Sequence, residues 1–423
     1  MPHTCGIIES NHILLNIASY IQIEYMRTIN LPETTDTRKS VMSCAKELGL
    51  QLVGITTAAP FKRAEEVASL RNQQGLMGDL PWYTSERIIR GSRPKTLLPG
   101  AKSVISVAMN YLPEDLSEPR NHHTELTGRV ARYAQGFDYH LVLKERLLQL
   151  TMLLQKRLNY SFRYKIYVDD GPMIDREVAF RSAVGFFGKN TNIITKLGSW
   201  VFLGQILTDL AIKPDRPSRK SCGSCVRCIP ACPTGAIVAP YIIDSNKCIA
   251  YLTIEHRGPI PIELRPLIGD MVFGCDICQE VCPINVKLGT PTQEPAFRAP
   301  QQFSALDLRD IIKMDEPTFR DRFKKSPIFR AHKIGLQRNA CIVLGNLGNP
   351  TAIPELTDTL RFGESLVKGH AAWALGQIQG LEAKRALETC LITESDTWVR
   401  EEIQLALEIL TSSEKSDNHS ALQ

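Results

Sequence analysis

The spacing of apolar residues along the first half of the chain predicts short strands separated by helices. Helical spacing begins near Arg38, after which Val41, Ala45 and Leu48 follow one another three or four residues apart. Short apolar runs that are typical of buried strands lie at residues 103–108, 165–168 and 200–203. This alternation indicates an α/β domain, which we place at residues 38–215.

The last part of the chain repeats itself. Residues 338–345 align with residues 369–376 at a period of 31 residues, and residues 401–408 continue the pattern faintly at 32. Such a period is typical of HEAT-like helix pairs, in which stacked neighbours bury an apolar core that no single unit can bury. These stacks usually bind macromolecules, and a purely structural cap on the preceding domains is the alternative. We assign residues 299–423 to a basic segment and HEAT-like α-helical repeats.

Composition agrees with a cytoplasmic protein of several domains, because 423 residues with 43% hydrophobic and 22% charged side chains have room for two or three cores. We expect no membrane span and no secretory signal. The apolar stretch within the first thirty residues lacks a basic leader and is interrupted by Glu9, Asn11, Asn16 and Glu24. We treat residues 1–37 as an N-terminal extension, with Met26 as a candidate alternative start.

The net charge of +5 is too small to make the whole chain a nucleic-acid binder, but it is unevenly distributed. Residues 309–338 carry nine Lys or Arg against four acids, which is the equivalent of the entire excess. A solvated helix surface is one interpretation, and contact with a phosphate backbone is the other.

Eight of the twelve cysteines lie within residues 222–282. The first four have the C-x2-C-x2-C-x3-C-P spacing of bacterial two-cluster ferredoxins, in which the fourth cysteine binds the other cluster. The second set is an altered copy that begins with the distant Cys248. The crossed rule therefore predicts two 4Fe-4S clusters in a ferredoxin-like domain at residues 216–298, one held by Cys222, Cys225, Cys228 and Cys282, the other by Cys232, Cys248, Cys275 and Cys278.

Other uses of these cysteines fit the spacing less well. A four-thiolate zinc site needs paired C-x2-C motifs but no third cysteine and no terminal C-x3-C-P. A disulfide framework is typical of small secreted domains. The remaining cysteines are scattered, and we expect free buried thiols at Cys5, Cys44, Cys341 and Cys390.

Two further segments carry polar side chains. Residues 131–140 concentrate hydrogen-bonding groups at a strand-to-helix junction, although a helix N-cap would explain Asp138 locally. Residues 168–192 read as a strand end, a helix begun by Pro172 and a Gly-Lys-Asn-Thr-Asn loop that could seat a large polar ligand. The loop is not a P-loop, because only Lys189 and Thr191 match one.

Taken in order, the segments 131–140 and 168–192 and the cysteine block, with residues 251–259 and 274–282 inside it, resemble epoxyqueuosine reductase. This cobalamin-dependent family performs the last step of queuosine synthesis in tRNA. The resemblance runs from about residue 38 to 410. The chain departs from the expected pattern at Gly171, at Asp175, where Glu is expected, and at the pair Phe186 and Phe187.

The resemblance implies that the α/β domain binds cobalamin, and that the clusters refill it one electron at a time. Removing an epoxide oxygen as water takes two electrons and two protons. The family's proton donor aligns with Asp138, and we expect burial beside the corrin to raise its pKa. Motif position makes Asp138 and seven other residues candidate cobalamin contacts, namely Tyr133, Asp169, Asp170, Lys189, Asn190, Thr191 and Asn192.

The resemblance also implies partners: a tRNA that carries epoxyqueuosine in its anticodon loop, and an external low-potential electron donor, with the enzyme a monomer. Two other functions stay open. A cobalamin-dependent reductive dehalogenase also combines a corrin with two clusters, but that class looks exported, and this chain shows no twin-arginine leader and has a repeat tail. A non-catalytic ferredoxin-type electron carrier would not need the long α/β domain.

Overall fold

The computed structural model describes residues 34–114, 126–298 and 303–420. Cys5, Met26 and nearly all of the predicted N-terminal extension lie outside them. Within the described ranges, no helix is both long and apolar enough to cross a bilayer. The expected burial of Cys44, Cys341 and Cys390 as free thiols is confirmed.

The α/β domain is built on a four-stranded sheet. Its strands pair in the order β1 (Leu52–Thr57), β2 (Ser103–Asn110), β7 (Val201–Thr208) and β4 (Tyr164–Tyr167). The three strands expected from apolar runs are therefore confirmed. All the pairings are antiparallel, so the alternation of helices and strands does not build a parallel sheet.

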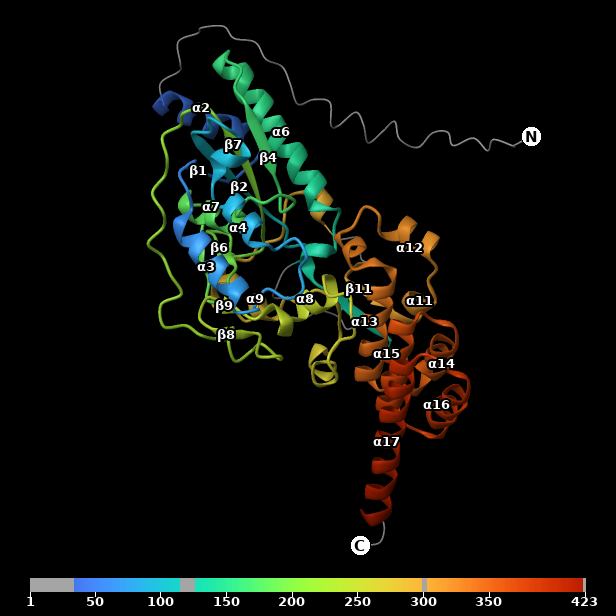
Figure 1. Cartoon of the computed structure of the whole chain (residues 1–423). Helices are drawn as coiled ribbons and strands as arrows, with labels where there is room; N and C mark the ends of the chain where they lie inside the picture. The colour runs from blue at the N-terminus through green and yellow to red at the C-terminus, as the bar shows by residue number, and fades with distance from the viewer. Residues whose placement is uncertain (1–33, 115–125, 299–302, 421–423) are drawn as a thin grey trace, which may run out of the picture. The chain divides into compact units, whose positions relative to one another are not determined.

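Both faces of this sheet are covered by helices, because its side chains alternate between them. Ile105 and Ile206 face a core shared with α2 (Thr34–Glu47) and α6 (Tyr139–Leu158). Val104 and Leu207 face α7 (Asp175–Arg181) on the other side. Figure 1 shows α6 running along the sheet. The connections between the strands contain α3 (Lys62–Gln73), α4 (Ser85–Gly91) and α5 (Pro94–Leu97).

The expected helix start at Pro172 is wrong. Helix α7 begins at Asp175, and residues 169–174 form an irregular turn in which Asp169 has a positive φ of 52°. Proline fixes its own φ but does not by itself start a helix, and Pro172 lies in this turn before α7. The turn instead brings the side chains of residues 169–174 to a cavity.

A second sheet connects three parts of the sequence. β3 (Thr127–Val130) pairs in parallel with β10 (Met271–Phe273) and antiparallel with β11 (Ala305–Asp307). Each strand comes from a different predicted domain, so the three regions share backbone hydrogen bonds. The domain boundaries themselves stay predictions.

The cysteine region consists of short elements. A small hairpin, β8 (Ile237–Ala239) with β9 (Ile242–Ile243), lies between Cys232 and Cys248, and another, β5 (Phe186–Phe187) with β6 (Ile193–Ile194), precedes the region in the sequence. Its helices begin directly after cysteines or include them: α8 (Ile249–Ile254), α9 (Ile277–Glu280) and α10 (Pro283–Leu288).

The helical repeats are confirmed. α13 (His332–Leu347), α15 (Ser365–Ile378) and α17 (Thr397–Ser420) lie side by side, and α14 (Ile353–Phe362) and α16 (Leu381–Thr393) pair with them (Figure 1). The period has a packing cause. A Cβ on Gly345 would lie 2.9 Å from the Cα of Ala374, and one on Gly376 would lie 3.0 Å from the Cα of Ala406. Each repeat glycine therefore lets the next repeat approach closely.

The basic segment forms α11 (Leu308–Lys313), α12 (Glu316–Phe323), the 3-10 turn Pro327–Ala331 and the start of α13. Its charges are not all on the surface. Arg338 is 1% exposed and donates to the carbonyl oxygens of Leu252, His256 and Gly258 at 2.6–2.9 Å. Arg338 therefore joins the repeats to the cysteine region and is no RNA contact.

Candidate active site

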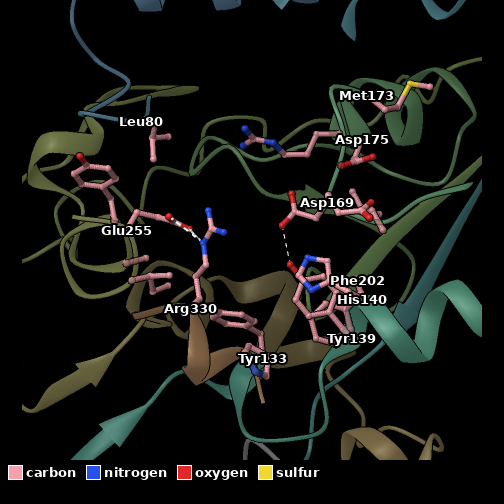
Figure 2. A pocket seen from close by; sticks show the side chains of 18 of the residues that line it. Leu80, Tyr133, Tyr139, His140, Asp169, Met173, Asp175, Phe202, Glu255 and Arg330 are labelled. Carbon is pink, nitrogen blue, oxygen red and sulfur yellow. Dashed lines mark hydrogen bonds and ion pairs between the residues drawn. The ribbon is translucent and has the colours of Figure 1, made fainter. Parts of the chain in front are cut away.

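A cavity of about 1040 Å³ lies where the α/β domain, the cysteine region and the basic segment meet (Figure 2). Its volume is at the upper limit of ordinary small-molecule pockets, so it suits a large ligand. Its lining combines carboxylates with aromatic and aliphatic side chains. The predicted site residues that line it are Tyr133, Asp138, Asp169, Asp170 and Asn192.

Asp138 is the N-cap of α6. Its Oδ1 accepts a hydrogen bond from the backbone N–H of His140 at 2.9 Å and faces the His140 Nδ1 at 2.7 Å. The loop before the helix is fixed from outside the α/β domain, since the N–H of Asp138 donates to the Lys325 carbonyl at 2.9 Å. Aspartate is common at this position because its side-chain oxygen accepts a hydrogen bond from an otherwise unpaired N–H of the first turn.

The expected rise in the pKa of Asp138 depends on burial beside a corrin and stays a prediction. Burial raises the pKa, but the side-chain and backbone hydrogen bonds from His140 outweigh burial and hold it below the ordinary value. The hydrogen bonds from His140 therefore favour the ionised form of Asp138.

Three other carboxyls meet in the cavity wall. Asp169 accepts a hydrogen bond from the Tyr139 hydroxyl at 2.7 Å, and Asp170 forms an ion pair with Lys144. Burial raises the pKa of Asp175 well above its ordinary range, and the charges of Asp169 and Asp170 add to this effect. Asp175 is thus the carboxyl in this wall that favours its protonated form.

An aromatic wall stands beside these acids. Tyr139 stacks on Phe202 with ring centroids 4.2 Å apart, and Tyr133 packs against Tyr139 at 6.3 Å. Burial raises the pKa of both tyrosines well above the ordinary value, so both phenols stay neutral. Figure 2 shows Tyr133, Tyr139 and Phe202 on the side of the cavity from which α6 begins.

Of the four loop residues predicted to contact cobalamin, only some line the cavity. Asn192 lines the cavity, whereas the side chains of Lys189 and Asn190 donate to the carbonyl oxygens of Gly223 at 2.8 Å and Cys278 at 3.1 Å. Thr191 accepts from Arg176 at 3.0 Å. This loop therefore ties the α/β domain to the cysteine region, and cobalamin contact by Lys189, Asn190 and Thr191 stays a prediction.

Several cavity residues were missed from the sequence. Arg330 and Glu255 form an ion pair with nitrogen–oxygen distances of 3.0 and 3.2 Å, and Trp82 lies beside them. Arg330 belongs to the basic segment, and Glu255 to the Glu-His-Arg-Gly-Pro motif, so a signal existed for both. No pattern in the sequence singles out Trp82.

The eight cysteines separate into two neighbouring groups. Burial raises the pKa of the Cys228 thiol, and the nearby charged groups that raise it further are Cys222, Cys225 and Cys282. Burial likewise raises the pKa of Cys275 to about 12, with Cys248 and Cys232 as neighbours. Burial also raises the pKa of Cys278, and its neighbours are Cys275 and Cys248 together with Cys228 of the first set. The neighbours of Cys228 and Cys275 agree with the crossed assignment, whereas Cys278 has neighbours from both sets, so the assignment stays a prediction.

The described residues contain no group of three or more His, Cys, Asp or Glu side chains placed to hold a single metal ion. The four thiolates of a 4Fe-4S cluster need not converge on one point, because each binds a different iron. The buried thiols must lose their protons when iron binds.

The group that contains Cys248 adjoins the cavity. α8 follows Cys248 directly and contributes Ala250, Tyr251 and Ile254 to the lining. Gln279, next to Cys278, also lines the cavity and accepts from the Ser199 hydroxyl at 2.9 Å. A cluster held by these cysteines would therefore lie next to residues that line the cavity.

Three protein-family models match the chain. Residues 221–285 match a "4Fe-4S double cluster binding domain", residues 92–170 match "Epoxyqueuosine reductase QueG, DUF1730", and residues 329–408 match "HEAT repeats". Together with the cavity, these matches define an iron–sulfur oxidoreductase with a repeat tail.

Relatives identify the family. An epoxyqueuosine reductase of Xanthomonas campestris pv. campestris is 39% identical over 82% of this chain and 97% of its own length. The chain therefore belongs to the epoxyqueuosine reductase family. A solved epoxyqueuosine reductase with a tRNA-Tyr epoxyqueuosine-modified stem loop is 32% identical, with a TM-score of 0.83 over 89% of this chain and 99% of that one. The Bacillus subtilis enzyme, solved with its catalytic aspartate loop swung out of the active site, matches with the same identity and coverage and a TM-score of 0.81.

Proposed function

We propose that this protein reduces epoxyqueuosine to queuosine in the anticodon loop of tRNA, with cobalamin in the cavity and two 4Fe-4S clusters. The observation that carries the proposal is the meeting of three features at one cavity: Asp138, the aromatic wall and the thiol group around Cys248. Family membership supports the same reaction. No feature of the site favours a dehalogenase or a non-catalytic carrier.

The cavity residues fit cobalamin. Tyr133, Tyr139 and Phe202 give the cavity an apolar wall for a large ligand, while Asp169 and Asp170 offer oxygen acceptors for the many amide groups around a corrin. When bound, cobalamin would supply the low-potential electrons with which both carbon–oxygen bonds of the epoxide are broken. The chain's own residues hold it, exclude water and deliver protons.

Cys232, Cys248, Cys275 and Cys278 would hold the cluster next to the cavity, because residues beside these ligands line the wall. Cys222, Cys225, Cys228 and Cys282 would hold the other cluster, which would accept electrons from an external low-potential donor. Such clusters would supply electrons one at a time, and the reaction needs two.

Asp138 delivers a proton to the departing oxygen. The hydrogen bonds from His140 favour the ionised form of Asp138, but a bound corrin and nucleotide would displace water, and desolvation raises the pKa of a carboxyl. The hydrogen bond to His140 gives Asp138 an adjacent group from which it can recover a proton. We place the enzyme in the cytoplasm as a monomer.

The experiment combines a spectrum with a turnover assay. Anaerobically reconstituted protein should bind cobalamin, seen by its visible spectrum, and should convert an RNA stem loop carrying epoxyqueuosine. Asp138→Asn should keep the helix cap and the cofactor, because Asn is as good an N-cap, while turnover falls by roughly two to four orders of magnitude.

Asp307→Asn is the matched control, because Asp307 is the N-cap of α11 and does not line the cavity. It should retain full turnover. Near-normal turnover of Asp138→Asn would remove Asp138 from the mechanism, and loss of cobalamin would make Asp138 a structural residue. Wild-type protein that neither binds cobalamin nor converts the RNA would overturn the proposal.

A further inference from the structure

Trp82 and Arg330 form a stacked pair in the cavity wall. The guanidinium carbon of Arg330 lies 4.8 Å from the centroid of the Trp82 ring, and both residues line the cavity. Neither is enclosed: Trp82 is 36% exposed and the Arg330 side chain 52%. Two flat groups are thus presented together to the space that a ligand enters.

Both members of the pair are held by the same short helix, α8. Glu255, at the C-terminal end of α8, accepts from the Arg330 Nε with both carboxylate oxygens. Tyr251 holds the loop that carries Trp82, because its hydroxyl accepts the Asp79 N–H at 2.7 Å. A Cβ on Gly78 would lie 2.4 Å from the Tyr251 ring, so this loop packs directly on that ring.

The Arg330 plane is fixed while part of its donor capacity stays open. Its Nε points at Glu255, and among the described residues no hydrogen bond to its terminal Nη atoms is found. Its backbone is fixed as well, since Arg257 donates to the Arg330 carbonyl at 2.8 Å. A preorganised aromatic–guanidinium pair loses little entropy on binding.

We propose that Trp82 and Arg330 are a stacking platform for an unpaired base of the RNA loop, next to the nucleotide that enters the cavity. This inference rests on the proposed function. Proteins bind single-stranded RNA by stacking splayed bases on aromatic side chains and on guanidinium planes. A base drawn into the cavity leaves its neighbour without a stacking partner, and the platform replaces that partner.

The test uses the holoenzyme and two RNA stem loops, each with the fluorescent base 2-aminopurine on one side of the target nucleotide. Stacking quenches this fluorophore, so wild-type protein should quench one of the two RNAs. Trp82→Ala should restore the emission and weaken binding about five- to a hundredfold. The salt dependence of binding should not change, because stacking releases no counterions.

Two conservative variants separate stacking from folding. Trp82→Phe keeps a flat ring and should retain part of the quenching, and Arg330→Lys keeps the charge but should lose affinity because the plane is gone. Controls are Phe362→Ala, an 82% exposed aromatic on α14, and Arg157→Gln, at the far end of α6 from Asp138. Both should behave as wild type.

The outcomes distinguish this inference from the function on which it rests. Wild-type binding and turnover with unchanged quenching and affinity in Trp82→Ala would overturn the platform alone. Quenching lost equally in Phe362→Ala would also overturn it. Wild-type protein that binds neither RNA would overturn the proposed function together with the platform.

Discussion

Asp138 and Asp175 line one cavity, yet their surroundings move their carboxyl pKa values in opposite directions. Burial acts on both, but His140 donates to Asp138 and lowers its pKa, whereas the charges of Asp169 and Asp170 add to burial at Asp175 and raise its pKa. Neighbouring titratable groups whose pKa values are shifted in opposite directions are typical of acid–base sites. Asp175 is therefore a second carboxyl that can keep a proton in the cavity.

Asp175→Asn should make the ligand-free protein more stable at pH 8, with a difference that shrinks toward pH 5. The raised folded-state pKa means that the stabilising proton is fully present below the ordinary carboxyl pKa and is lost as the pH rises through the folded pKa. Asn cannot ionise, so it avoids the buried charge. The check is the midpoint of thermal unfolding at both pH values.

Asp138→Asn is the opposite control. A lowered folded-state pKa contributes stability above the ordinary carboxyl pKa, and this is lost as the pH falls through the folded pKa. This variant should therefore be less stable than wild type at pH 8. If both substitutions shift the midpoint in the same direction at pH 8, the assigned surroundings of one carboxyl are wrong.

The sequence placed Asp138 at a helix start but could not give the sign of its pKa shift. That sign depends on the contact between the His140 ring and the Asp138 carboxylate, and the sequence does not show how the ring is oriented. Trp82 was missed for a similar reason, since its role depends on Arg330 and Tyr251, which are distant in the chain. Local spacing carries no information about such contacts.

At the scale of elements, α13 has two tasks. Its repeat positions stack on α15, and Arg338 and Asn339 at its centre bond to backbone groups of the cysteine region. Asn339 donates to the carbonyl oxygens of Thr253 and Val272 at 2.8 and 3.0 Å. The first repeat is therefore an integral part of the core below the cavity.

Arg338→Met should destabilise the protein by at least ~3 kcal/mol, because three buried carbonyl groups lose a charged donor. Urea unfolding measures the loss. Arg320→Met, which removes an exposed pair with Glu316 on α12, should cost less than ~1 kcal/mol. Equal losses of unfolding free energy in the two variants would contradict the role of Arg338 as a buried hydrogen-bond donor between the repeats and the cysteine region.

The repeats could be predicted because each unit contacts mainly its sequence neighbours, so that period and packing coincide. The strands β2, β4 and β7 were also recognisable from their apolar runs. Their antiparallel order and the sheet of β3, β10 and β11 were not, because partner choice depends on segments far apart in the chain.

For the whole molecule, the predicted crossed use of cysteines would join the two halves of the cysteine region. Anaerobically reconstituted protein should hold about eight irons. Cys248→Ser should impair the cluster next to the cavity and leave the other largely intact, so iron should fall toward about four. Cys390→Ser, a buried thiol in the repeats, should retain the full content. Wild-type iron near four would contradict the presence of two clusters.

We expect the basic segment, residues 309–338, to contact the RNA backbone. It contributes Lys324 and Arg330 to the cavity lining, and Arg320 and Lys324 are exposed, so phosphates beside the cavity are within its reach. Arg338 is excluded by its burial. The exposed charges concentrate on α12 and the turn after it, which makes this stretch the best candidate for the grip on the RNA backbone.

Replacing four basic residues on this stretch by alanine should weaken tRNA binding and lower the salt slope by roughly 0.7 for each phosphate that is no longer neutralised. The residues are Arg320, Arg322, Lys324 and Lys325. A short anticodon stem loop should still be reduced at high concentration, because the substitutions change the cavity lining only at Lys324 and leave Asp138 and the aromatic wall in place. The matched control removes the same charge from the α/β domain at Lys39, Lys62, Lys95 and Lys102 and should keep the wild-type slope. If both quadruple variants keep the affinity and slope of wild type, the segment is a solvated surface, and the contact with the RNA backbone lies elsewhere on the protein.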